Sequence, residues 1–270
     1  MMDNSLATHW LLLRGLSREI EHWGDFPALL QSDFPGSKVH ALDLPGTGLL
    51  YQQASPKRIA AITDSVRQHA IEQNMLDQPL TLLAYSLGGM VAWDWLQRYP
   101  EDINGAVLLN TSFANLSPFY QRLRWQSYAT FLGLLLQSNL HKREASILKL
   151  VSNRTDVGGL IASEWTKIQQ QRPVSMKNSL HQMTAAATYK PNKQKTTQPV
   201  LLLSSQKDRL VSSACSLAIQ KRWQVDLAIH PWAGHDICLD QPLWVVDRIK
   251  RWTESFTQSS KLHQSVTVPS

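Results

Sequence analysis

A serine at position 86 lies between an apolar run and two glycines, in the stretch LTLLAYSLGG at residues 80–89. Such a serine can be a helix cap, a small residue in a tight turn, or a nucleophile. The run LTLLAY is typical of a buried strand, and residues 87–99 repeat their apolar positions at helical spacing. A serine at a sharp strand-to-helix turn exposes its hydroxyl, and the small residues Ala84 and Gly88 permit that turn. The pattern therefore favours a nucleophile.

A general base and a carboxylate are needed next. A serine hydroxyl is a poor nucleophile unless a histidine removes its proton, and a carboxylate must orient that histidine. Asp208 follows the apolar run PVLLLS at 199–204, and His235 follows the run VDLAIHP at 225–231. Because the carboxyl ends of parallel strands meet along one edge of a sheet, we expect Ser86, Asp208 and His235 to converge there. The chemistry would be acyl transfer.

Other side chains compete for the roles of acid and base. Asp236 and Asp240 are also carboxylates, but both follow the last apolar run rather than the preceding one. The position that ends the fourth run is Asn110, which supplies no carboxylate. Of the nine histidines, only His235 follows a late apolar run with a glycine directly before it. We therefore predict Asp208 as the acid and His235 as the base.

An oxyanion hole would complete such a site with two backbone N–H groups. One donor is expected from the residue after the nucleophile, which is Leu87, and the other from the loop after an early strand. In the early segment LLLRGLSRE, Gly15 permits a turn and Leu16 is placed to donate. We predict the amides of Leu16 and Leu87 as the oxyanion donors.

The elements that position these residues can be read from six short apolar runs, which alternate with longer amphipathic stretches. Near-continuous apolar strands alternating with helices predict an α/β protein with a mostly parallel sheet flanked by helices. The predicted strands are residues 9–13, 39–44, 80–85, 105–110, 199–204 and 225–231, and helices are predicted over 57–73, 87–99 and 242–256.

One connection is much longer than a single crossover helix requires. Between Asn110 and Val200 lie 89 residues, which include helical stretches such as 119–136 and 143–153 and little that resembles a strand. We interpret this segment as a helical lid inserted into the sheet domain. The predicted division is a core of residues 1–111 and 192–257, a lid of residues 112–191, and a polar, disordered tail of residues 258–270.

Composition excludes several other classes of protein. The chain of 270 residues has no recognisable secretory signal and no apolar stretch of the roughly 20 residues that span a bilayer. Cys215 and Cys238 have no zinc-site spacing, so we expect free thiols, no metal and a cytoplasmic location. The net charge of +6 is local, since residues 113–190 hold ten Lys/Arg against three Asp/Glu. No nucleic-acid-binding motif accompanies that charge, so a nucleic acid is not the expected partner, and without a spanning stretch we expect no membrane partner either.

With these residues identified, the chain resembles the α/β-hydrolase superfamily, and more narrowly its lidded, esterase-like members. The resemblance covers roughly residues 9–257. It rests on RGL at 14–16, DLPGTG at 43–48, AYSLGG at 84–89, KDRLV at 207–211 and AGHD at 233–236. It implies hydrolysis of an ester or thioester through an acyl-enzyme, without a cofactor. The family usually has His where this chain has Arg14 or Thr47, and Arg14 could either place a cation beside the site or form a surface salt bridge.

The resemblance also suggests what the lid binds. Esterases that act on pimeloyl-carrier-protein methyl esters use basic lids, so Arg14, Arg122 and Arg124 are candidates for contacts with a substrate or with an acidic acyl carrier protein. A solvated helical face is the alternative reading of the same charge. Apolar lid residues could line an acyl pocket or form the core of the lid itself; they are Phe119, Trp125, Phe131 and Leu134–Leu136.

The sequence leaves three functions open. The first is a serine hydrolase acting on a small acyl ester. The second is a carbon–carbon lyase similar to the menaquinone-pathway synthase, which shares the YSLGG turn and holds an anionic substrate with basic residues. The third is a non-catalytic binding protein with the same fold, although the complete set of Ser86, Asp208 and His235 disfavours it.

Overall fold

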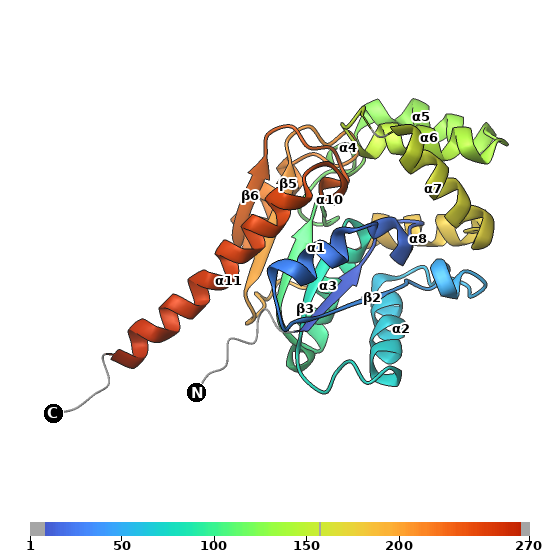
Figure 1. The fold of residues 1–270 in the computed structure, drawn as a ribbon. Coiled ribbons are helices and arrows are strands. Elements are labelled where there is room, and N and C mark those ends of the chain that lie inside the picture. Colours follow the sequence, from blue (N-terminus) through green and yellow to red (C-terminus); the bar gives the residue numbers. More distant parts are fainter. Residues whose placement is uncertain (1–8, 157, 266–270) are drawn as a thin grey trace.

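A six-stranded parallel sheet forms the centre of the molecule (Figure 1). A computed structural model describes residues 9–156 and 158–265. The strand order is β2-β1-β3-β4-β5-β6, and every neighbouring pair is parallel. The strands are β1 (His9–Leu13), β2 (Lys38–Leu42), β3 (Leu80–Tyr85), β4 (Ile103–Leu109), β5 (Val200–Ser205) and β6 (Asp226–His230). The predicted α/β fold is confirmed, and each of the six apolar runs overlaps a strand.

Helices cover both faces of the sheet, so consecutive residues of each strand face different cores. Leu82 packs in one core with α2, α3 and α9, whereas Leu83 packs in the other with α1 and α11. This two-sided burial explains why the central strands are mainly apolar, whereas the edge strands β2 and β6 are partly exposed and contain Lys38, His40 and Asp226. The covering helices are α1 (Phe26–Asp33), α2 (Ile59–Glu72), α3 (Leu87–Arg98), α9 (Ala214–Trp223) and α11 (Pro242–Ser265). The short elements are η2 (Ile20–Trp23), η3 (Gly48–Leu50), η4 (Pro100–Asp102) and α10 (Ile237–Asp240).

A helical insertion separates β4 from β5 and lies beyond the carboxyl ends of the strands (Figure 1). It contains α4 (Phe119–Arg122), η5 (Trp125–Ser127), α5 (Tyr128–Leu136), α6 (Leu140–Val151), α7 (Gly158–Gln171) and α8 (Met176–Thr188). The stretch predicted as one helix over 119–136 is broken at Leu123 and Arg124, which adopt extended backbone angles. Helix α6 begins earlier than predicted because the Asn139 side chain accepts a hydrogen bond from the Lys142 N–H.

The last helix differs from the sequence expectation. α11 continues to Ser265, although the polar sequence predicts a disordered tail from residue 258. Residues 254–265 contain no Pro or Gly that would stop the helix. In Figure 1 the end of α11 extends well beyond the sheet. The rest of the predicted tail, residues 266–270, lies outside the described residues.

Among the helices in residues 9–156 and 158–265, none is both long enough and apolar enough to cross a membrane.

Candidate active site

Ser86 occupies a strained turn between β3 and α3. Its φ of 54° and ψ of −112° lie outside the regions that most residues with a side chain adopt. The turn is fixed by the Ser86 N–H, which donates to the carbonyl of Leu109 at 2.8 Å. A Cβ atom at Gly88 would lie only 2.6 Å from the carbonyl oxygens of Leu13 and Arg14. Glycine at position 88 therefore lets α3 start against β1, which places the serine at the carboxyl edge of the sheet.

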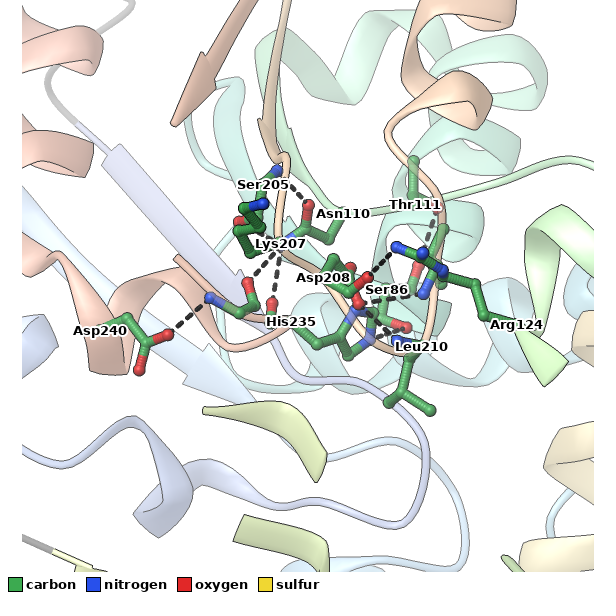
Figure 2. Close-up of polar contacts among 12 residues, drawn as sticks. Ser86, Asn110, Thr111, Arg124, Ser205, Lys207, Asp208, Leu210, His235 and Asp240 are labelled. Atoms are coloured by element: carbon green, nitrogen blue, oxygen red, sulfur yellow. Dashed lines mark hydrogen bonds and ion pairs between the residues drawn. The ribbon is translucent and has the colours of Figure 1, made fainter. Parts of the chain in front are cut away.

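Three side chains form one hydrogen-bonded series at this edge, and Figure 2 shows them together. His235 Nε2 lies 3.1 Å from Ser86 Oγ, and His235 Nδ1 lies 2.6 Å from Asp208 Oδ2. The other carboxylate oxygen of Asp208 accepts hydrogen bonds from the N–H groups of Leu210 at 2.7 Å and Val211 at 3.0 Å. Asp208 and His235 are both buried, so the imidazole is held in one orientation between the hydroxyl and the carboxylate.

Asn110 connects the loops that carry Asp208 and His235. Its amide nitrogen donates to the carbonyl of His235 at 2.7 Å and to Ser205 Oγ at 3.1 Å. Its amide oxygen accepts from the Ser205 N–H at 2.9 Å (Figure 2). From the sequence, Asn110 was predicted only to supply no carboxylate. An amide side chain directly after an apolar run could have indicated its role, because a buried amide needs hydrogen-bond partners and the ends of neighbouring strands supply them.

Asp240 has a similar role on the other side of the histidine. It accepts hydrogen bonds from the N–H of Gly234 at 2.6 Å, from Ser152 Oγ at 2.5 Å and from the N–H of Asn153 at 3.0 Å. Asp240 therefore joins the loop that carries His235 to the end of α6. From the sequence, Asp240 was only a competing candidate for the catalytic acid. Its hydrogen bonds to the insertion could not be predicted, because Ser152 and Asn153 lie 88 and 87 positions away in the chain.

The two predicted oxyanion donors lie beside the serine. Leu16 and Leu87 both line the cavity that contains Ser86. Leu87 is the first residue of α3, where N–H groups have no partner within the helix. The loop that carries Leu16 is fixed by Ser17, whose N–H donates to the side chain of Gln182 in α8 at 2.8 Å. Both residues therefore lie at the cavity, and the oxyanion role of their amides stays a prediction.

Arg14 forms a buried ion pair, whereas the sequence suggested a substrate contact or a surface salt bridge. Its guanidinium lies 2.6 Å from Asp236 and stacks over the rings of Trp23 and Tyr85. Burial disfavours the charge, but Asp236 outweighs it, so the pKa of Arg14 is raised. Arg14 lines the cavity with a charge that is already neutralised, because carboxylate and guanidinium are both almost inaccessible.

The other two predicted cations also have partners within the protein. Arg122 lines the cavity and donates to the carbonyls of Ala186 at 2.5 Å and Ala187 at 2.9 Å, at the end of α8. Burial lowers the pKa of Arg122. Arg124 donates to the backbone carbonyl of Asp208 at 2.6 Å and does not line this cavity (Figure 2). Arg124 therefore supports the loop of Asp208.

The cavity beside Ser86 and His235 has a volume of about 460 Å³, within the range of small-molecule sites. Its lining is mainly apolar and comes largely from the insertion. Phe119, Phe131 and Leu134 line it, as expected for an acyl pocket, whereas Trp125 does not and is 70% exposed. The side chains of Leu135 and Leu136 lie outside the described residues. In the part of the chain that the structure describes, no group of three or more His, Cys, Asp or Glu is arranged to hold a metal ion.

Comparison with known proteins places this geometry in a family. Residues 15–242 match the family described as serine aminopeptidase, S33. No curated protein shows significant similarity to the sequence.

Solved structures share the fold at low sequence identity. A candidate lipase (lip1) from Acinetobacter baumannii has a TM-score of 0.74 and 18% identity, covering 94% of this chain and 86% of that chain. The esterase RhEst1 from Rhodococcus sp. has a TM-score of 0.71 and 15% identity, covering 92% and 90%. A candidate non-heme bromoperoxidase, BpoC, from Mycobacterium tuberculosis has a TM-score of 0.70 and 17% identity, covering 92% of each chain.

Proposed function

Because the chain belongs to the α/β-hydrolase family described as serine aminopeptidase, S33, we propose that it is a serine hydrolase that cleaves a carboxylic ester or thioester. One observation carries the proposal. Ser86, His235 and Asp208 form a hydrogen-bonded series, with distances of 3.1 and 2.6 Å, at the wall of a mainly apolar cavity. An apolar cavity beside a nucleophile suits an acyl chain.

The first half of the proposed reaction forms an acyl-enzyme. His235 Nε2 removes the proton of Ser86 Oγ while that oxygen attacks the acyl carbon, and Asp208 stabilises the imidazolium that results. The N–H groups of Leu16 and Leu87 would stabilise the negative charge that develops on the acyl oxygen. His235 then protonates the leaving alcohol or thiol, and the bond between it and the acyl carbon breaks.

The second half releases the acid. Water enters in place of the leaving group, and His235 takes its proton as the water oxygen attacks the acyl-enzyme. Collapse of this intermediate returns the proton to Ser86. The same imidazole therefore acts as base and acid in turn, and the two hydrogen bonds that hold it keep it within reach of both oxygens.

The charges around the cavity favour a neutral acyl ester over charged substrates. The arginines that line it are Arg14, Arg18, Arg122 and Arg143. Arg14, Arg18 and Arg122 each have a protein partner within 2.7 Å, and Arg143 lies 3.7 Å from Glu144, so a substrate carboxylate would have to compete with these partners. Arg14 keeps two buried donors, Nε and Nη1, that have no hydrogen-bond partner among the described residues. The carboxylates that line the cavity, Glu144 and Asp236, are paired with arginines, so a peptide amino terminus gains little from them.

These charges also bear on the two alternatives. The carbon–carbon lyase requires cations that attract an anionic substrate, and the pairing of the cavity arginines disfavours it. A non-catalytic binding protein would not need the strained backbone at Ser86 or the aligned imidazole.

Two further expectations stay predictions. A reducing, cytoplasmic compartment suits Cys215 and Cys238, which are both buried free thiols. An acidic acyl carrier protein would need accessible cations, and Arg122 and Arg124 instead bind backbone carbonyls.

Labelling with a fluorophosphonate probe tests the nucleophile. The wild type and Ser112→Ala should be labelled, whereas Ser86→Ala should not. Ser112 is a matched control because it lines the same cavity without contacting His235. Labelling that persists in Ser86→Ala would contradict the proposal. A panel of acyl esters then separates hydrolase from lyase, because a lyase would be labelled at Ser86 without turning over any ester.

A further inference from the structure

Exposed apolar side chains gather on the outer part of the insertion, at α4, η5 and α5. We call this group the outer patch; its members are Phe119, Tyr120, Trp125, Tyr128 and Leu132. Trp125 is 70% exposed, Leu132 is 65% exposed and Tyr120 is 64% exposed. Single exposed apolar residues are common on proteins, but five within 14 positions of the chain, of which Phe119 and Tyr128 have ring centroids 6.5 Å apart, indicate a binding surface. Figure 1 shows α5 along the outer rim of the molecule, away from the sheet.

The sequence of α5 strengthens this interpretation. The helix reads YATFLGLLL and contains no charged residue, whereas its neighbour α6 contains Lys142, Arg143, Glu144 and Lys149. A surface helix normally has a charged face toward water, and α5 lacks one. An apolar helix at the surface is therefore suited to contact another apolar phase.

The outer patch is continuous with the cavity that holds the proposed nucleophile. Phe119 belongs to both, being more than half exposed and also lining the cavity. Phe131 and Leu134 of α5 line the cavity as well, while Leu132 of the same helix faces solvent. Phe119 and α5 therefore provide an apolar connection between the patch and the cavity.

Charge indicates which kind of apolar phase fits. Residues 113–143 contain no Asp or Glu and four cations, which are Arg122, Arg124, Lys142 and Arg143. An exposed aromatic group flanked by cations is typical of proteins that bind anionic lipid headgroups, with Trp and Tyr at the level of the interface. An acidic protein partner would need cations at the centre of the surface. Here the centre is aromatic. Arg122 and Arg124 donate to backbone carbonyls, which are uncharged, so they add positive charge around the patch without being at its centre.

We propose that the outer patch docks on an anionic lipid surface and that the substrate is an acyl ester drawn from that surface into the cavity. The second part rests on the proposed hydrolase function; the docking itself does not. The sequence predicts no membrane partner, because it contains no segment that could span a bilayer. Docking on a lipid surface does not need such a segment, since a helix can lie in the plane of the interface.

Vesicle flotation with Ser86→Ala protein tests docking without any hydrolysis. The protein should float with vesicles of phosphatidylglycerol and phosphatidylcholine, and less with phosphatidylcholine alone. Replacing Trp125 and Leu132 by Ser should weaken binding at least about tenfold, because two exposed apolar side chains lose their lipid contacts. The control replaces Leu49 and Leu243 by Ser, since both are as exposed but lie outside the insertion. It should bind as the parent protein does.

Several results would overturn the docking proposal. The first is that the parent protein does not float with the vesicles. The second is that the control variant loses as much vesicle binding as the Trp125→Ser, Leu132→Ser variant. The third is that Trp125 and Leu132 are required for a dimer or a carrier-protein complex but not for lipid binding.

The substrate part needs a second measurement with the active enzyme. The Trp125→Ser, Leu132→Ser protein should cleave a soluble short-chain ester at the wild-type rate and a vesicle-borne ester at least about tenfold more slowly. Neither residue lines the cavity, so soluble turnover reports on the intact site. Equal rates on the vesicle-borne ester would contradict the substrate class. Vesicle binding without turnover of any ester would leave docking supported and contradict the hydrolase.

Discussion

The two halves of the helical insertion meet the rest of the molecule in opposite ways. The inner half, α6–α8, is joined to the sheet domain by buried polar contacts. Arg18 pairs with Glu144 of α6 at 2.7 Å, and Glu19 pairs with Arg172 directly after α7 at 2.5 Å. Asp240 bonds to the end of α6. The outer half, α4–α5, has an uncharged helix and a group of exposed aromatic side chains.

This difference indicates separate roles for the two halves of the insertion. The inner contacts reach the loop of Leu16 on one side and the loop of His235 on the other. Helices α6–α8 therefore belong to the frame that holds the proposed catalytic groups, because displacing them would move both loops. The outer half is bonded to the sheet domain near α4, where the Gln121 carbonyl accepts from the Ser212 N–H and Arg124 donates to the carbonyls of Asp208 and Leu210. Helix α5, beyond these bonds, is the part proposed to contact a surface and to admit substrate. The lid that the sequence predicts would correspond to the outer half rather than to the whole insertion.

Breaking the inner half should have the largest effect. Glu144→Leu leaves the guanidinium of Arg18 buried without its carboxylate, so the free energy of unfolding should fall by about 3–5 kcal/mol. Urea denaturation measures this change. The matched control is the double variant Arg18→Met, Glu144→Leu, which removes both charges and should recover most of the loss. A single variant as stable as the wild type would show that the pair does not fix α6 to the loop.

A smaller loss is expected when the inner half is released from the histidine loop. Asp240→Ala removes the acceptor of three hydrogen bonds, two of them from backbone N–H groups, and should lower the free energy of unfolding by about 2–3 kcal/mol. A shift of the loop would also misplace His235. We therefore expect kcat to fall about 10–100-fold with little change in KM. Asp240→Asn keeps one acceptor oxygen and should be intermediate. Loss of stability at unchanged kcat would assign Asp240 to folding alone.

The proposed catalytic residues were predictable because their signals are local. Ser86 directly follows an apolar run, and Asp208 and His235 lie in the loops after two later runs. Parallel strands bring such positions to one edge whatever lies between them. The fold was predictable for the same reason. Strands that are covered by helices on both faces are mainly apolar, so each strand of the sheet overlaps an apolar run in the sequence.

The contacts between the insertion and the loops were not predictable. Arg18 and Glu144 are separated by 126 positions, and no period in the sequence relates them. Arg14, Arg122 and Arg124 illustrate the same limit. Their charge suggested contacts with an external anion, but only the packed structure shows that Asp236 or a backbone carbonyl already occupies each guanidinium.

The junction between the inner half and the sheet domain should also respond to pH through His22 of η2, whose ring packs against Trp165 of α7. Burial, reinforced by the charges of Arg18 and Arg14, holds the pKa of His22 well below its usual value. Below about pH 6.5 the unfolded chain binds a proton at His22 that the folded chain does not, so acid favours unfolding. Relative to His22→Gln, the wild type should lose up to about 1.4 kcal/mol of stability per pH unit as the pH falls below about 6.5. Urea titrations at pH 7.5 and 5.5 measure it. Parallel pH profiles would show that His22 is protonated in the folded state.

Disrupting the outer half should have the smallest effect on stability. Replacing Trp125 and Leu132 by Ser should change the free energy of unfolding by no more than about 0.5 kcal/mol, because both side chains are largely exposed. The same urea titrations apply. A loss of more than about 1.5 kcal/mol would mean that the patch packs against the protein, and the contrast between the two halves would fail. If the variant has an unchanged free energy of unfolding but binds vesicles more weakly, the outer patch serves the proposed docking and does not contribute to the frame that holds His235.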